Sequence, residues 1–119
     1  MGSKRRKEPA FYFCELWRMN YYYFLGWTWE EFVAYVKKNY DYEVCQDVKP
    51  AGKCLQLTKG DRGCIMLIWV EKKTDYPSLA HECLHAANWT LERAGWHPSF
   101  NDEPQTYLMT NIMRQALGK

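Results

Sequence analysis

The chain has 119 residues, of which 47% are hydrophobic and 17% aromatic, a composition that builds one core and excludes a disordered chain. Sixteen lysines and arginines against 14 aspartates and glutamates leave a net charge of +2, which argues against a nucleic-acid partner and against an acidic tail. The longest apolar run, Cys64–Val70, is far shorter than the ~20 residues of a membrane helix, so no membrane partner is expected.

The N-terminal residues 1–10 are basic and lead to no clean hydrophobic segment. They therefore predict no signal peptide and are expected to form a flexible N-terminus. No repeat or long linker divides the remainder of the chain, and residues 11–119 are predicted to form a single domain.

The first part of this domain is rich in aromatic residues. Residues 11–29 favour strand structure, because aromatic side chains fit a half-buried sheet. Thr28 and Glu31 then have the spacing of a capping box, which predicts a short helix over residues 29–39.

A β region is expected next. Residues 42–48 are a candidate strand, residues 54–58 alternate as a half-buried strand does, and the charged residues 59–63 predict a hairpin loop. The continuous apolar run at residues 64–70 predicts a central strand that is covered on both faces.

Two helices are predicted to close the chain. The first begins near Pro77, with Ser78 as its N-cap, and ends at Gly95. The second begins around Asp102 and continues through Leu117. Together these elements predict an α+β fold, in which a small, mostly antiparallel sheet packs against both helices.

The first of these helices carries an HExxH sequence at residues 81–85. At ~100° per residue, His81 and His85 lie ~40° apart on one helix face, so both imidazoles can bind one metal ion. Glu82 lies ~100° from His81, where it can accept a proton from a metal-bound water. Cys83, at ~200°, faces away from the histidines and is excluded as a ligand.

The same helix carries apolar residues at helical spacing. They are expected to form a stripe that docks on the sheet, clear of both histidines and nearly opposite Glu82. The members of this stripe are Ala80, Leu84, Ala87 and Leu91.

A catalytic zinc needs a third protein ligand and leaves its fourth position for water. The candidates are Glu103, His97 and Asp102. Glu103 is preferred because it opens a helix that can hold it rigidly, whereas His97 lies on a loop after Gly95; His₂Glu and His₃ sites are both chemically sound. Tyr107, one turn beyond Glu103, could point its hydroxyl at the metal and donate to an oxyanion, although a packing role fits it better.

Residues 81–114, about a third of the chain, resemble the zincin-type metallopeptidases, and more closely the small zincin-like proteins encoded by bacteriophages and prophages. The shared elements are HExxHA at residues 81–86, a helix end at 91–95, Asn-Asp-Glu-Pro at 101–104 and Tyr-Leu at 107–108. The resemblance implies a zincin-like minimal domain, with His81, His85 and Glu103 as zinc ligands and Glu82 as the general base.

The HExxH motif, taken together with the later Gly95, His97 and Phe100, also resembles the SprT-like proteases. In that family a histidine after a glycine completes the metal site. Pro98 directly after His97 and the absence of later zinc-ribbon cysteines depart from that family. A SprT-like site would use His97 in place of Glu103 and would imply a DNA-associated role.

Two functions fit this sequence. The first is a zinc-dependent hydrolase, most simply a peptidase, that cleaves a peptide or protein substrate with Zn2+-activated water and with Glu82 as general base. The second is a non-catalytic, zinc-stabilised phage protein that binds a host component. Only the enzyme needs Glu82, so its presence favours the enzyme.

The five cysteines (14, 45, 54, 64 and 83) are odd in number, irregularly spaced and without a CxxC pair. This pattern predicts reduced thiols and a cytoplasmic location, in the host cell if the protein is phage-encoded. Neither the natural substrate nor the oligomeric state is indicated by the sequence.

Overall fold

The computed structural model describes residues 7–45, 49–58, 64–96 and 103–119. These residues form four strands and three helices. In chain order they are β1 (Ala10–Cys14), β2 (Met19–Leu25), α1 (Trp29–Tyr40), β3 (Gly52–Thr58), β4 (Cys64–Val70), α2 (Tyr76–Arg93) and α3 (Glu103–Ala116). The hairpin loop expected at residues 59–63 lies outside the described residues.

The strands form one mixed sheet in the order β1-β2-β4-β3. The pairs β1–β2 and β3–β4 are antiparallel, and β2–β4 is parallel. The α+β fold expected from the sequence is therefore confirmed. Of the described helices, none is long and apolar enough to cross a membrane.

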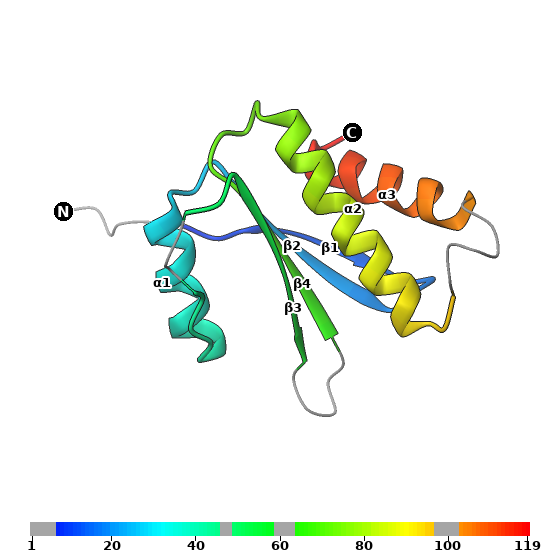
Figure 1. Ribbon diagram of the computed structural model, residues 1–119, viewed down its shortest axis with the longest axis horizontal. Coiled ribbons are helices and arrows are strands. Elements are labelled where there is room, and N and C mark those ends of the chain that lie inside the picture. Colours follow the sequence, from blue (N-terminus) through cyan, green and yellow to red (C-terminus); the bar gives the residue numbers. More distant parts are fainter. Residues whose placement is uncertain (1–6, 46–48, 59–63, 97–102) are drawn as a thin grey trace.

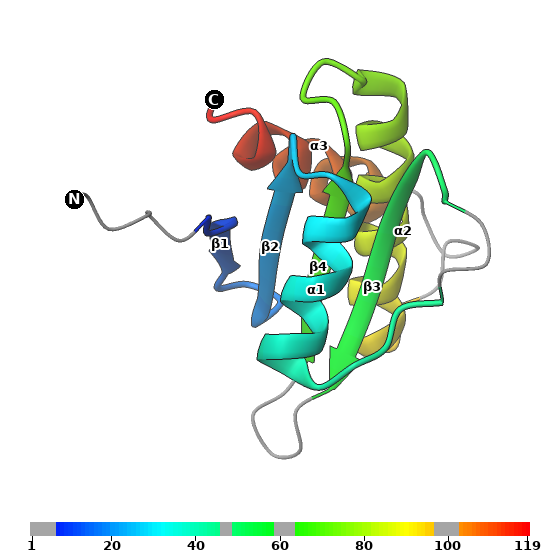
Figure 2. The same cartoon turned by 90° about the vertical axis from the view of Figure 1, so that its left-hand side faces the viewer.

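The sheet separates two helical layers: α1 covers one face, and α2 and α3 cover the other (Figures 1 and 2). β4 contributes to both layers, because all seven of its residues are buried. Met66 and Ile68 belong to the core beneath α2 and α3, whereas Leu67 and Trp69 belong to the core beneath α1. This alternation confirms that β4 is a central strand.

The start of α1 is the capping box that the sequence predicts. The Glu31 amide donates to Thr28 Oγ1 at 3.1 Å, and the Thr28 amide donates to Glu31 Oε1 at 2.8 Å. Both orphan donors at the helix start are thereby satisfied, and the helix buries Phe32 and Val36 against the sheet.

The strand expected at residues 42–48 is not formed in its described part, residues 42–45; residues 46–48 lie outside the described residues. Asp41 ends α1 in a left-handed conformation with φ 51°, which turns the chain. Val44 then packs into the core beneath α1. Residues 42–45 therefore lie outside the sheet, whose strands are held by ladders of backbone hydrogen bonds.

The start of α2 also differs from the expectation. Its N-cap is Asp75, whose side chain accepts a hydrogen bond from the Ser78 amide at 3.2 Å. Ser78 therefore lies inside the first turn, because the carboxylate three residues earlier satisfies the amide that a cap must satisfy. The helix ends before Gly95, which has φ 85°, the left-handed stop that the sequence predicts.

Candidate functional site

The two motif histidines lie together on the exposed face of α2. The Nε2 atoms of His81 and His85 are 3.1 Å apart, and their rings are nearly perpendicular with centroids 4.6 Å apart. Both side chains are exposed. Helical spacing thus brings both imidazole nitrogens to one point on the protein surface, as expected.

Glu82 is turned toward the sheet. It is 7% exposed, and it lies against Gly52, the first residue of β3. A Cβ placed on Gly52 would be 3.0 Å from both Cγ and Oε2 of Glu82. The glycine therefore provides the space that the glutamate side chain occupies.

The apolar stripe of α2 is rotated from the one predicted. Leu84 is 39% exposed, so it does not dock on the sheet. The residues buried toward the sheet are Leu79, Cys83, Ala86, Ala87, Thr90 and Leu91. This face is centred about 180° from His81, which places Glu82 at its margin instead of opposite to it. Cys83 is buried in this face, away from the histidines, as expected.

This position at the margin shapes the acid–base behaviour of Glu82. Burial raises the pKa of its carboxyl, while electrostatic interactions with His81, His85 and Lys53 oppose that rise in part. Desolvation is the larger effect, so the pKa is raised overall. A carboxylate with a raised pKa accepts a proton more readily near neutral pH.

Two further α2 residues extend the histidine face and were not predicted. The Trp89 ring stacks on His85, with centroids 5.8 Å apart and planes 25° apart. The side-chain oxygen of Asn88 accepts a hydrogen bond from the side-chain amide of Gln105 in α3. Their spacing from His85, three and four residues, is a signal that could have indicated both. Gly52 had no such local signal, since it is distant in the sequence.

The third ligand is not assembled in the described residues. No group of three or more His, Cys, Asp or Glu side chains close enough to hold a metal occurs within residues 7–45, 49–58, 64–96 and 103–119. Glu103 is the first residue of α3 and is exposed. The other two candidates, His97 and Asp102, lie outside the described residues.

Tyr107 is not directed at the histidines. It lies two residues after Gln105, which places it on the opposite side of α3 from the contact with α2. Its side chain is 70% exposed, so the expected packing role is not seen either. The ring lines an open hollow between α3 and the β1–β2 hairpin, together with Tyr12 and Trp17.

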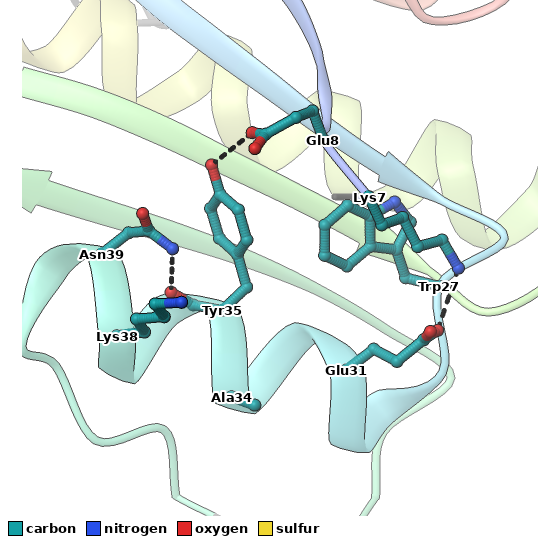
Figure 3. Close-up of a pocket in the computed structure, with 8 residues that line it drawn as sticks. All are labelled: Lys7, Glu8, Trp27, Glu31, Ala34, Tyr35, Lys38 and Asn39. Carbon is teal, nitrogen blue, oxygen red and sulfur yellow. Dashed lines mark hydrogen bonds and ion pairs between the residues drawn. The ribbon is translucent and has the colours of Figure 1, made fainter. Parts of the chain in front are cut away.

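A second hollow, of about 260 Å³, lies on the other side of the sheet, along α1 (Figure 3). The Lys7 ammonium lies 5.2 Å from the centre of the Trp27 ring and 2.9 Å from Glu31. Tyr35 donates to Glu8 at 3.1 Å. These contacts hold the end of the N-terminal segment against α1, and the sheet separates them from the HExxH face.

Comparison of the chain with protein-family models, curated proteins and solved structures finds no match. The functional argument therefore depends on the side chains and their arrangement.

Proposed function

We propose that this protein is a zincin-like, zinc-dependent hydrolase, most simply a peptidase. In this proposal His81, His85 and Glu103 hold the metal, and Glu82 is the general base. The observation that carries it is the convergence of two exposed imidazole nitrogens beside one partly desolvated carboxylate. An HExxH helix packed with a C-terminal helix over a small sheet is also what the zincin resemblance implies.

The separation of the imidazole nitrogens supports zinc. Two Zn–N bonds of about 2.05 Å at a tetrahedral angle of about 109° place the two nitrogens about 3.3 Å apart. The Nε2 atoms of His81 and His85 are 3.1 Å apart. The two side chains therefore fit two corners of a tetrahedral site with a movement of a few tenths of an ångström.

The contact between α2 and α3 supports Glu103 as the third ligand. Asn88 lies on the same face of α2 as the histidines, because seven residues after His81 correspond to nearly two helical turns. Gln105 is hydrogen-bonded to Asn88, so the first turn of α3 adjoins this face. Glu103 is in that first turn. Glu103 is therefore carried by a helix that adjoins the histidine face, and a ligand on a rigid element is held firmly.

The partly buried position of Glu82 beside the histidine face supports its proposed role as the base. When bound, zinc supplies a water of lowered pKa and polarises a carbonyl. Glu82 would accept the proton of the attacking water and deliver it to the leaving amine. Its contact with Gly52 restricts the carboxylate, which keeps it close to the histidine face without making it a ligand.

Metal analysis of the purified protein tests the site. One zinc per chain is expected, and His81→Ala or His85→Ala should abolish tight binding. His97→Ala is the matched control, because it removes the remaining histidine of the chain. In a competition titration, Glu103→Ala should weaken zinc binding far more than His97→Ala. The reverse ranking would favour the SprT-like ligand set, and a chain that binds no zinc would end the proposal.

A proteomic cleavage screen of wild type against Glu82→Gln tests the reaction. The amide retains the shape of the side chain and removes the base, so zinc binding should persist while cleavage is lost. A Glu82→Gln variant with full biological effect would instead support the zinc-stabilised protein that binds a host component.

A further inference from the structure

The outer edge of β1 is the less protected edge of the sheet. The strand order leaves β1 and β3 at the two edges, and Figure 2 shows β1 at the margin. β3 carries the charged Lys53, and Tyr40 and Tyr42 lie beside its last residues. β1 has the sequence Ala-Phe-Tyr-Phe-Cys, with neither a charge nor a proline. Such an edge can pair with a strand of another chain.

One face of this edge strand exposes aromatic side chains. Phe11 is 55% exposed and Phe13 is 43% exposed. The Phe11 ring contacts Tyr22 with centroids 4.9 Å apart, and Tyr22 packs against the core beneath α1. Phe11 and Phe13 therefore point to the α1 side of the sheet, since residues two apart share a face.

We propose that β1 is a dimerisation strand, which pairs antiparallel with β1 of a second copy of this chain around a twofold axis at Tyr12. This register sets Phe11 opposite the partner's Phe13, and Phe13 opposite the partner's Phe11. It also pairs all five residues of the strand. A register centred on Phe11 or on Phe13 would set one phenylalanine opposite Pro9 or Glu15, so the Tyr12 register is the self-complementary one. Cross-strand aromatic pairs of this kind stabilise a sheet.

The charges at the two ends of β1 favour a second copy over an acidic or basic partner. The exposed residues Lys7 and Glu8 precede the strand, and the exposed residues Glu15 and Arg18 follow it. The twofold axis sets the start of one strand beside the end of the other. Within the part of the chain that the structure describes, each junction then combines one cation and one anion from each copy, and these four charges cancel.

Apolar groups beyond the strand also become complementary in this arrangement. Leu16, which follows the strand, is 81% exposed. A hollow of about 540 Å³ adjoins the opposite end of β1 and is lined in part by Ala10, Leu25 and Leu117. The twofold axis brings Leu16 of each copy to the end at which the other copy has this hollow. Both ends of the pair can thereby bury apolar surface.

Sedimentation equilibrium of the full chain from about 10 µM to about 1 mM tests the proposal. A concentration-dependent dimer is expected, and Phe13→Lys should weaken it at least about tenfold, because a charge is placed at the strand pair. Tyr42→Lys is the matched control, since Tyr42 is 42% exposed and lies beside β3, the opposite edge strand of the sheet. Circular dichroism verifies that both variants fold.

A mixed sample of isotope-labelled and unlabelled chains identifies the register. Nuclear Overhauser contacts between Phe11 of one copy and the partner's Phe13 are expected. A dimer without these contacts, or one weakened equally by Tyr42→Lys, would assign the interface to another surface and overturn the proposal. A chain that is monomeric over the whole range would also overturn it, and would leave the β1 edge to an extended segment of a different protein.

Discussion

Replacing Gly52 with alanine measures how firmly β3 holds Glu82. The added Cβ would lie 3.0 Å from Glu82 Cγ and 3.3 Å from Cδ, whereas carbon atoms in good contact are about 3.5–4.0 Å apart. Overpacking of this kind costs roughly 1–3 kcal/mol. A strain-free Gly→Ala substitution stabilises by about 0.4–1 kcal/mol through the unfolded chain. We therefore expect Gly52→Ala to lower the free energy of unfolding by about 1 kcal/mol, within a range of about 0–2.6 kcal/mol.

The same substitution in a Glu82→Ala background isolates the contact. With the glutamate side chain removed, Gly52→Ala should be neutral or stabilising by about 0.4–1 kcal/mol. Urea unfolding of the four proteins in EDTA gives the coupling free energy between the two positions, expected at about 1–3 kcal/mol. Leu84→Ala, which removes an exposed side chain of the same helix, should show no coupling with Gly52→Ala. An equal cost of Gly52→Ala with and without Glu82 would refute the contact.

Three further predictions concern buried groups. Burial raises the pKa of Glu82, so the metal-free folded protein keeps the carboxyl proton of Glu82 at pH values where the unfolded chain has lost it. The free energy of unfolding should therefore fall as pH rises above the ordinary Glu pKa of about 4.3. Urea unfolding at several pH values should show a smaller fall for Glu82→Gln. DTNB at about pH 8 should react rapidly with Cys45 alone, because the other four thiols are buried and burial raises the pKa of Cys83 to about 12; two rapid thiols would contradict this. Tyr21→Phe removes a buried 2.7 Å hydrogen bond to Thr90 and should lower the free energy of unfolding by about 1 kcal/mol, whereas Tyr22→Phe, on the other face of the sheet, should have a smaller effect.

The features that the sequence predicts correctly are those fixed by neighbouring residues. The Thr28–Glu31 capping box involves two side chains three residues apart, and the histidine pair involves one helical turn. Gly95 ends α2 through its own backbone conformation. Each of these is decided within one turn of helix, so no knowledge of the rest of the chain is needed.

The rotated face of α2 is an error that arises because distant residues decide the outcome. Leu79 and Cys83 are apolar, but so are their neighbours Ala80 and Leu84. Hydrophobic periodicity is therefore consistent with two buried faces of α2 that differ by about 100°. In the structure the buried face is the one on which Thr90 forms a hydrogen bond with Tyr21 and Glu82 lies beside Gly52. Both partners are on strands far along the chain. The parallel pairing of β2 with β4 was out of reach for the same reason.

That parallel pair has a consequence for how the chain folds during synthesis. Asn20 pairs with Ile65, 45 residues later, and synthesis at about 5–20 residues per second completes β4 about 2–9 s after β2. The β1–β2 hairpin can form within about 1–10 µs, so the inner edge of β2 remains unpaired for a time about 10⁵–10⁷ times longer than hairpin formation takes. α1 is the next element to emerge, and its Phe32 contacts Phe24 of β2 with centroids 5.0 Å apart. The helix can therefore shield one aromatic face of the nascent ribbon before the strand that completes it has been made.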